Sequence, residues 1–340
     1  MTTRLGIMGF GRIGRNVFRL LHGRDDMHIV AINDIADREG LTYLLKYDSI
    51  YGRFPGDITY ADGVCNYDTR KVLFGDARTP ADTRWSDAGV DIVLETTSQY
   101  RDLDSIRGHL DNGAAKVILT SSPDTPGEIP LLLSGVNNDL LDQEPEVVAL
   151  GSNTSNAIAP VLKTLHETFG IQNAYLTVVK AMTNTGRLAD VPTDSFRTSR
   201  AAAENIIPTD TNSAEIITQV LPQLAGKLAV SALMVPVNDG STVDMVTELE
   251  KPATTTEVNS AIRAAAANLY RGILGYVEDP IVSSDVKLDS RSGLFDSLAT
   301  MVTAETLLKT ITWFNNGWGY SHRAVETAER MAAQLEGAAA

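Results

Sequence analysis

The sequence has little sulfur and no long apolar run. Cys65 is the one cysteine among 340 residues, so no disulfide can form within the chain, which is typical of a reducing compartment. No apolar stretch is long enough to span a bilayer, and the N-terminus lacks the apolar segment of a secretory signal. We therefore expect a cytoplasmic protein with no membrane partner and an unreactive, half-buried thiol at Cys65.

An excess of positive charge is also absent. The formal net charge is −14, and the acidic residues are mixed with the basic ones along the chain. A polyanion would be repelled, so we expect no nucleic-acid partner. We predict no metal site, and Cys65 has no neighbouring cysteine or histidine that could share a metal. At ~100–200 residues per domain, a chain of this length predicts two domains.

What the sequence does have is a glycine-rich turn in a specific setting. Residues 9–14 read Gly-Phe-Gly-Arg-Ile-Gly and lie between a predicted strand, 4–8, and a predicted helix, 15–21. A second apolar run, 28–32, follows, and Asp34 stands 20 residues after the last glycine of the turn. Strand, glycine turn, helix, strand and spaced acid together are typical of a dinucleotide-binding unit.

The residue types of this turn suit a bound pyrophosphate. Gly9 allows the tight turn, Gly11 lets the backbone approach the phosphates, and Gly14 lets helix and strand pack closely. Asp34 would accept hydrogen bonds from ribose hydroxyls and repel a 2′-phosphate, which favours NAD over NADP. We predict NAD as the cofactor, held by Gly9, Phe10, Gly11, Arg12, Ile13 and Asp34.

Three further apolar runs, at 90–95, 116–119 and 147–150, predict buried parallel strands, so the first 150 residues indicate an α/β domain. Hydroxyl residues follow the first two of these runs. They could contact a cofactor at the carboxyl ends of the strands, or they could simply cap the next helix. The candidates for cofactor contact are Thr97, Ser98 and Thr120.

The sequence resembles the phosphorylating glyceraldehyde-3-phosphate dehydrogenases over essentially its whole length. The resemblance implies an α/β fold with a Rossmann-type parallel-sheet domain (1–151) and an α+β second domain with an antiparallel sheet (152–316). It also implies a C-terminal helix (317–340) packed on the first domain, and a homotetramer. Four segments carry the resemblance: residues 6–15, Gly-Ile-Met-Gly-Phe-Gly-Arg-Ile-Gly-Arg; 44–49, Leu-Leu-Lys-Tyr-Asp-Ser; 200–208, Arg-Ala-Ala-Ala-Glu-Asn-Ile-Ile-Pro; and 313–323, with Trp-Phe-Asn-Asn and Gly-Tyr-Ser-His-Arg.

The resemblance also assigns residues beyond the glycine turn. Arg78 matches an arginine near the adenine, Asn316 the asparagine that binds the nicotinamide carboxamide, and Tyr320 a nearby tyrosine. Four more residues match positions that contact the substrate in the family: Ser152, Thr183, Arg200 and Thr211. Ser98 stands where the family has a glycine.

The departures from the family concern the reacting groups. In the ungapped match, Asn153 occupies the position of the nucleophilic cysteine and Lys180 that of the catalytic histidine. Met234 and Glu215 replace an arginine and a lysine near the phosphate sites. An amide is not a nucleophile at neutral pH, so the thioester chemistry of the family should be absent. The catalytic candidates are then Lys180 and Asn153.

Three functions remain open. The chain could be an NAD(H)-dependent oxidoreductase that transfers hydride directly to or from a small substrate without two phosphates. Lys180 would then act as acid or base or, more remotely, form a Schiff base. It could instead act on the nicotinamide of NAD(H) itself. It could also be a non-catalytic NAD-binding scaffold or sensor.

Overall fold

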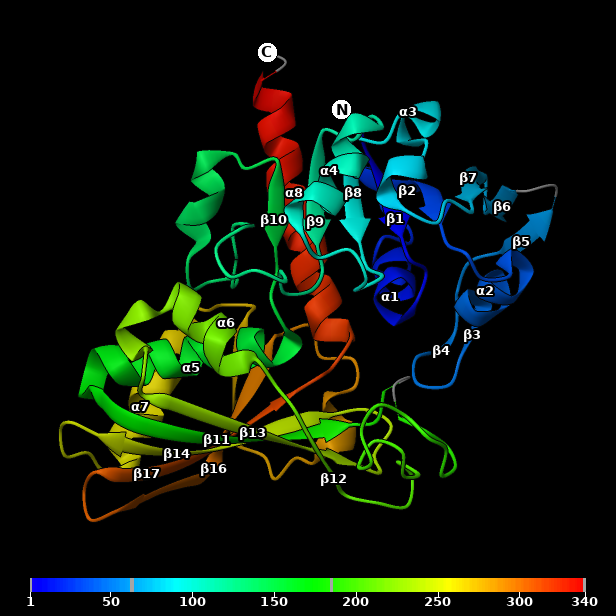
Figure 1. Ribbon diagram of the computed structural model, residues 1–340. Coiled ribbons are helices and arrows are strands. Elements are labelled where there is room, and N and C mark those ends of the chain that lie inside the picture. Colours follow the sequence, from blue (N-terminus) through cyan, green and yellow to red (C-terminus); the bar gives the residue numbers. More distant parts are fainter. Residues whose placement is uncertain (1, 62–63, 184–185, 339–340) are drawn as a thin grey trace. The chain divides into compact units, whose positions relative to one another are not determined.

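A computed structural model of the chain describes residues 2–61, 64–183 and 186–338. The chain divides into two compact units (Figure 1). Unit 1 comprises Met1–Leu132, Asn137–Gly151 and Ser321–Ala340, and unit 2 comprises Leu133–Val136 and Ser152–Tyr320. Each unit is built around its own sheet and has its own buried core.

Unit 1 contains an eight-stranded sheet in the order β10-β9-β8-β1-β2-β7-β6-β5. All neighbours from β10 to β7 are parallel, whereas β6 is antiparallel to both β7 and β5. The strands are β1 (Thr3–Met8), β2 (Met27–Asn33), β5 (Ile58–Ala61), β6 (Val64–Tyr67), β7 (Arg70–Gly75), β8 (Ile92–Glu95), β9 (Lys116–Leu119) and β10 (Val147–Ala149). The strand order reverses between β1 and β8: β2 and β7 follow β1 on one side, and β8, β9 and β10 follow on the other. Ligands bind at such a switch point, beyond the carboxyl ends of the strands.

Helices connect successive parallel strands of unit 1. They are α1 (Arg12–Leu20), α2 (Arg38–Lys46), α3 (Trp85–Ala88) and α4 (Leu103–Asp111), and a short strand pair, β3 (Tyr47–Asp48) and β4 (Gly52–Arg53), follows α2. Every residue of β8 and β9 is buried, as in a sheet covered on both faces. The last helix, α8 (Trp318–Ala338), contributes Gln334, whose side chain accepts a hydrogen bond of 2.9 Å from Lys116 Nζ.

Unit 2 contains a seven-stranded mixed sheet in the order β12-β13-β11-β14-β17-β16-β15. Its strands are β11 (Ile171–Ala181), β12 (Ile207–Thr209), β13 (Leu228–Val235), β14 (Ser241–Leu249), β15 (Leu274–Val277), β16 (Gly293–Thr303) and β17 (Leu307–Phe314). The pairs β11–β13 and β15–β16 are parallel and the other pairs are antiparallel. The helices α5 (Asn153–Phe169), α6 (Ser213–Val220) and α7 (Thr255–Ala267) lie on one side of this sheet (Figure 1).

The predicted α/β fold, with a parallel Rossmann-type sheet and a second α+β domain, is confirmed. The second sheet is mixed because two of its strand pairs, β11–β13 and β15–β16, are parallel. Helix α5 begins at Asn153 because the Ser152 and Ser155 side chains form a capping box that satisfies its first amides. Within the described ranges, no helix is long and apolar enough to cross a membrane.

Candidate functional site

The glycine turn of unit 1 is shaped by close contacts that leave no room for side chains. Gly9 has a φ of +90°, and a Cβ there would lie 2.8 Å from Thr97 Cγ2. A Cβ at Gly14 would lie 2.5 Å from the carbonyl oxygen of Gly9. A Cβ at Gly11, in contrast, would meet no atom within 4 Å. The turn is therefore tight toward the protein at two glycines and open at the third, as phosphate binding requires.

Helix α1 begins directly after this turn with free donors. Gly11 is its N-cap, and no side chain caps the helix. The first amides of a helix have no partner within the helix, so they can bind an anion there with help from the helix dipole. Arg12 and Ile13 supply these amides, since the first helical hydrogen bond runs from the Arg15 amide to the Gly11 carbonyl, 3.0 Å away.

Asp34 lies beside the turn at the end of β2. Its Oδ2 accepts a 2.6 Å hydrogen bond from the Phe10 amide, and its Oδ1 accepts one of 2.8 Å from the Ala36 amide. The carboxylate is thus fixed next to the glycine turn and keeps lone pairs for hydroxyl donors. The open Gly11, the uncapped helix and this placed acid fit the pyrophosphate and ribose of NAD.

The hydroxyl residues after β8 and β9 have different roles. Thr97 lies against Gly9, and Ser98 has a φ of +59°, a left-handed conformation that favours glycine. Thr120 is buried, and its hydroxyl donates to the Glu95 carbonyl at 3.0 Å. Arg78 is exposed, and its carbonyl accepts a hydrogen bond from the Tyr100 hydroxyl. The cofactor contacts of these residues stay predictions.

Unit 2 contains a pocket of about 670 Å³ that brings together four of the predicted site residues, Asn153, Lys180, Thr183 and Asn316. The pocket also has ionisable residues that the sequence analysis missed, namely Arg187, Asp194 and Asp210. Arg187 and Asp194 lie in the polar stretch 183–200, whose length was the one available signal.

Lys180 is the last residue but one of β11. Its side chain is partly buried, and among the described residues no carboxylate lies within ion-pair distance of Nζ. Burial lowers the pKa of Lys180, because desolvation disfavours the ammonium form. Lysine Nζ can therefore exchange a proton at a pH closer to neutrality than an exposed lysine can.

Asn153 is fixed at the first turn of α5. Its Nδ2 donates to the Asn316 carbonyl at 2.9 Å, and its Oδ1 accepts from the Thr154 amide at 2.8 Å. The Asn316 side chain is in turn held by Ser241, whose hydroxyl also accepts from the Ala181 amide at 3.0 Å. Ala181, the residue after Lys180, thus belongs to the same hydrogen-bond network as Asn153.

Other predicted site residues, three for the substrate and Tyr320 for the cofactor, lie outside the lining of this pocket. Arg200 forms an ion pair of 2.9 Å with Asp190 and is exposed. The Thr211 hydroxyl lies 2.9 Å from that of Ser213, and Ser152 is occupied with its capping box. Tyr320 is buried, and burial raises the pKa of its hydroxyl far above the usual value. The roles of these residues stay predictions.

The sheet order, the glycine turn and the placed acid define unit 1 as a dinucleotide-binding domain of the dehydrogenase type. The chain belongs to the glyceraldehyde-3-phosphate dehydrogenase family. Residues 3–103 match the sequence model of its NAD binding domain, and residues 152–316 match that of its C-terminal domain. NAD is the cofactor of this domain, as predicted.

The similarity to curated relatives extends over almost the whole chain. The chain is 41% identical to the glyceraldehyde-3-phosphate dehydrogenase of Geobacillus stearothermophilus, over 98% of this chain and 99% of the relative. It is 43% identical to glyceraldehyde-3-phosphate dehydrogenase 2 of Streptomyces avermitilis, over 98% and 100%. It is also 43% identical to the enzyme of Mycobacterium avium, over 96% and 97%.

Proposed function

We propose that this chain is an NAD(H)-dependent oxidoreductase that works without a thiol. NAD, when bound, supplies the acceptor or donor of the hydride. The observation that carries the proposal is the shared pocket of Lys180, Asn153 and Asn316. Asn316 matches the residue that binds the nicotinamide carboxamide in related sequences, so this pocket is where a substrate carbonyl or alcohol would react.

Lys180 is proposed as the acid and base of the reaction. When a carbonyl is reduced, the carbon gains the hydride and the oxygen becomes an alkoxide, which takes a proton from the Lys180 ammonium. When an alcohol is oxidised, the neutral Lys180 amine takes the hydroxyl proton while the hydride leaves the carbon. An amine with a lowered pKa holds both forms within reach, which is what general acid–base catalysis needs.

Asn153 is proposed to orient the substrate oxygen. One N–H of its side chain is donated to the Asn316 carbonyl, and the amide nitrogen has a second hydrogen that it can donate to a ligand. An amide cannot attack an aldehyde as a thiolate does, so we infer that no covalent thioester forms at this position. The protein would thus be a dehydrogenase homologue that does not phosphorylate its substrate.

The substrate is proposed to carry at most one anionic group. Arg200 is paired with Asp190 and lies outside the pocket lining. Met234 lines the pocket and is uncharged, so neither residue provides a positive charge there. Lys180 and Arg187 are the cations of the lining, and Asp194 and Asp210 offset them. Two phosphates would meet this mixed charge without enough positive partners.

A panel of small carbonyl compounds and alcohols tests this proposal. We expect at least one member to change the absorbance of the reduced nicotinamide band in a way that depends on the protein. A mass change in NAD or NADH without any second substrate would favour an enzyme that acts on the cofactor. Tight NAD binding without turnover across the panel would contradict the oxidoreductase and favour a scaffold or sensor.

We also propose the homotetramer of the resemblance, and the mass in solution is its test. Exposed apolar side chains lie on one face of the sheet of unit 2. Tyr175, Val246, Lys309 and Met301 occupy directly opposite positions on the neighbouring strands β11, β14, β17 and β16, so they form one row across this face. Tyr175 is 52% exposed and Met301 is 53% exposed. Exposed apolar side chains that share one sheet face, here with one lysine among them, are typical of subunit contacts.

A further inference from the structure

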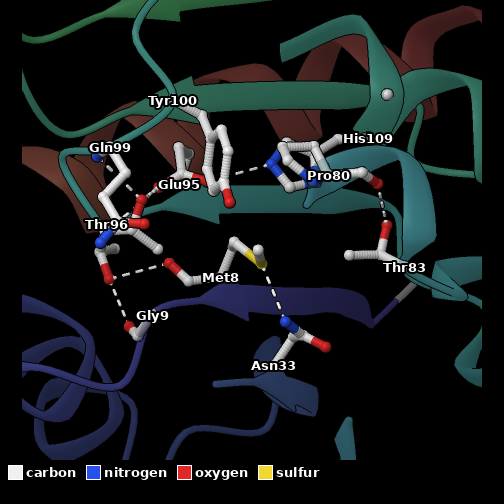
Figure 2. Close-up of polar contacts among 12 residues, drawn as sticks. Met8, Gly9, Asn33, Pro80, Thr83, Glu95, Thr96, Gln99, Tyr100 and His109 are labelled. Carbon is white, nitrogen blue, oxygen red and sulfur yellow. Dashed lines mark hydrogen bonds and ion pairs between the residues drawn. The ribbon is translucent and has the colours of Figure 1, made fainter. Parts of the chain in front are cut away.

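Unit 1 contains a buried polar cluster near the glycine turn, and Figure 2 shows two of its members, Glu95 and His109, together with Gly9. Glu95, the last residue of β8, and His109 of α4 are both fully buried, and Trp85 of α3 is 2% exposed. His109 Nε2 lies 3.2 Å from Glu95 Oε2, and Trp85 Nε1 donates to His109 Nδ1 at 2.9 Å. The proposed chemistry uses none of these three groups.

The Trp85 indole fixes which nitrogen of the His109 ring accepts and which donates. An indole N–H can only donate, so His109 Nδ1 is the acceptor and the proton of the neutral ring is on Nε2. That proton is donated to Glu95 Oε2. Glu95 Oε1 accepts from both the amide and the hydroxyl of Thr97, at 2.7 and 2.6 Å. Both carboxyl oxygens of Glu95 therefore accept hydrogen bonds.

The Glu95 carboxyl group is fully buried. Within the described part of the chain, no lysine or arginine forms an ion pair with Glu95. Burial of a carboxylate is costly unless its oxygens are hydrogen-bonded, so its acceptors must be matched in full. Three donors match them, and two of the three belong to Thr97. Most of the hydrogen bonds to the Glu95 carboxyl group thus come from the turn that follows β8.

Thr97 in turn sets the position of the glycine turn. Its hydroxyl accepts from the Gln99 amide at 3.1 Å, which closes the turn after β8. A Cβ at Gly9 would lie 2.9 Å from the Thr97 amide nitrogen, so the two turns are already in contact. The Thr96 hydroxyl also donates to the Gly9 carbonyl (Figure 2). The series of hydrogen bonds from Trp85 through His109 and Glu95 to Thr97 thus ends at a residue that contacts the phosphate-binding turn.

We infer that Glu95, oriented by His109 and Trp85, is a positioning residue for the dinucleotide: its carboxylate holds the Thr97 turn, and so the Gly9 turn, in the conformation that binds NAD. The inference depends on the NAD-binding domain and is independent of the hydride transfer proposed above. The cluster does not touch the cofactor phosphates itself and acts through Thr97.

The test is the NAD affinity of Glu95→Gln, measured by calorimetry. A glutamine has one acceptor and one donor group, so whichever way it turns, its NH₂ faces a donor, either the Thr97 amide or the protonated His109 nitrogen. We expect NAD to bind about tenfold more weakly or worse. We also expect faster hydrogen exchange at the Thr97 and Gln99 amides without NAD, a readout that needs no catalysis.

The matched control is Val93→Ala. Val93 lies on the same strand, is fully buried and has no polar side chain, so its truncation lowers stability without touching the turn. We expect this variant to lose melting temperature and to keep its NAD affinity within about twofold. An equal loss of affinity in Val93→Ala and Glu95→Gln would show a merely structural role and overturn the inference.

A milder variant covers the case in which Glu95→Gln does not fold. Thr97→Val keeps the shape and the amide of residue 97 but removes the hydroxyl that links Glu95 to Gln99. We expect about threefold or greater weakening of NAD binding and faster exchange at the Gln99 amide. Wild-type affinity and exchange in Thr97→Val would overturn the inference as well.

Discussion

Replacing Lys180 by alanine should lower the turnover rate about 10²–10⁴-fold on any substrate found for this protein, the usual contribution of a general acid or base. The NAD affinity should change little, because the glycine turn, the uncapped start of α1 and Asp34, which we expect to hold the pyrophosphate and ribose, stay unchanged. Steady-state rates and calorimetric NAD titration measure the two effects separately. A variant with the wild-type rate would remove Lys180 from the mechanism.

The pH dependence should follow the lowered pKa of Lys180. The rate of carbonyl reduction needs the ammonium form, so it should fall as the pH rises through a pKa below the ordinary lysine value of 10.5. Alcohol oxidation needs the neutral amine and should rise through the same pKa. Lys227→Ala is the matched control, because Lys227 pairs with Glu250 at 3.2 Å outside the pocket lining and should leave both profiles unchanged.

Thiol alkylation should leave the activity and the NAD affinity of this protein at about nine-tenths or more of their starting values. Cys65, the one cysteine, is 1% exposed on β6, so it is fully buried and not half-buried as expected from the sequence. Burial raises the pKa of its thiol to about 11. Only the thiolate reacts, so iodoacetamide should find almost no nucleophile in the folded chain. Mass spectrometry of the treated protein measures the number of labels.

Asn153→Cys is the matched control for alkylation. The substitution places a thiol in the pocket beside Lys180, so this variant should gain one label that the wild type lacks. Loss of wild-type activity on labelling of Cys65 would contradict the account, since Cys65 would then be the reactive group that we infer to be absent.

The dinucleotide site could be predicted from the sequence because its parts are local. Gly9, Gly11 and Gly14 lie within one turn, and Asp34 ends the next strand, so spacing alone indicates their common place. The structure shows a reason for each glycine that the motif implies: close approach at Gly9 and Gly14, and open space at Gly11. The α/β fold followed from the same alternation of strands and helices.

The rest of the candidate site depends on contacts between distant residues. The ion pair of Arg200 with Asp190 leaves that arginine outside the pocket lining, and nothing in the spacing of the two residues indicates this. The cluster of Trp85, Glu95 and His109 joins two helices to a strand, and each residue alone is typical of an ordinary buried position. Such pairs have no periodic signal in the sequence.

The start of α5 and the short strands of unit 2 also depend on contacts that the sequence signals only weakly. The start of α5 depends on the reciprocal hydrogen bonds of Ser152 and Ser155, and a Ser-to-Ser capping box is a weaker sequence signal than one with Glu. The short strands β12 and β15 form because the sheet of unit 2 provides neighbouring strands for them. Their own residues have too short a pattern to predict pairing.

One measurement tests the central claim that this family member binds NAD but does not use thioester chemistry. Purified protein is titrated with NAD by calorimetry, and glyceraldehyde 3-phosphate and inorganic phosphate are then added to the same sample while NADH is recorded. We predict saturable NAD binding and no NADH above the protein-free blank. Phosphate-dependent formation of NADH, or no NAD uptake at about millimolar concentration, would contradict the account.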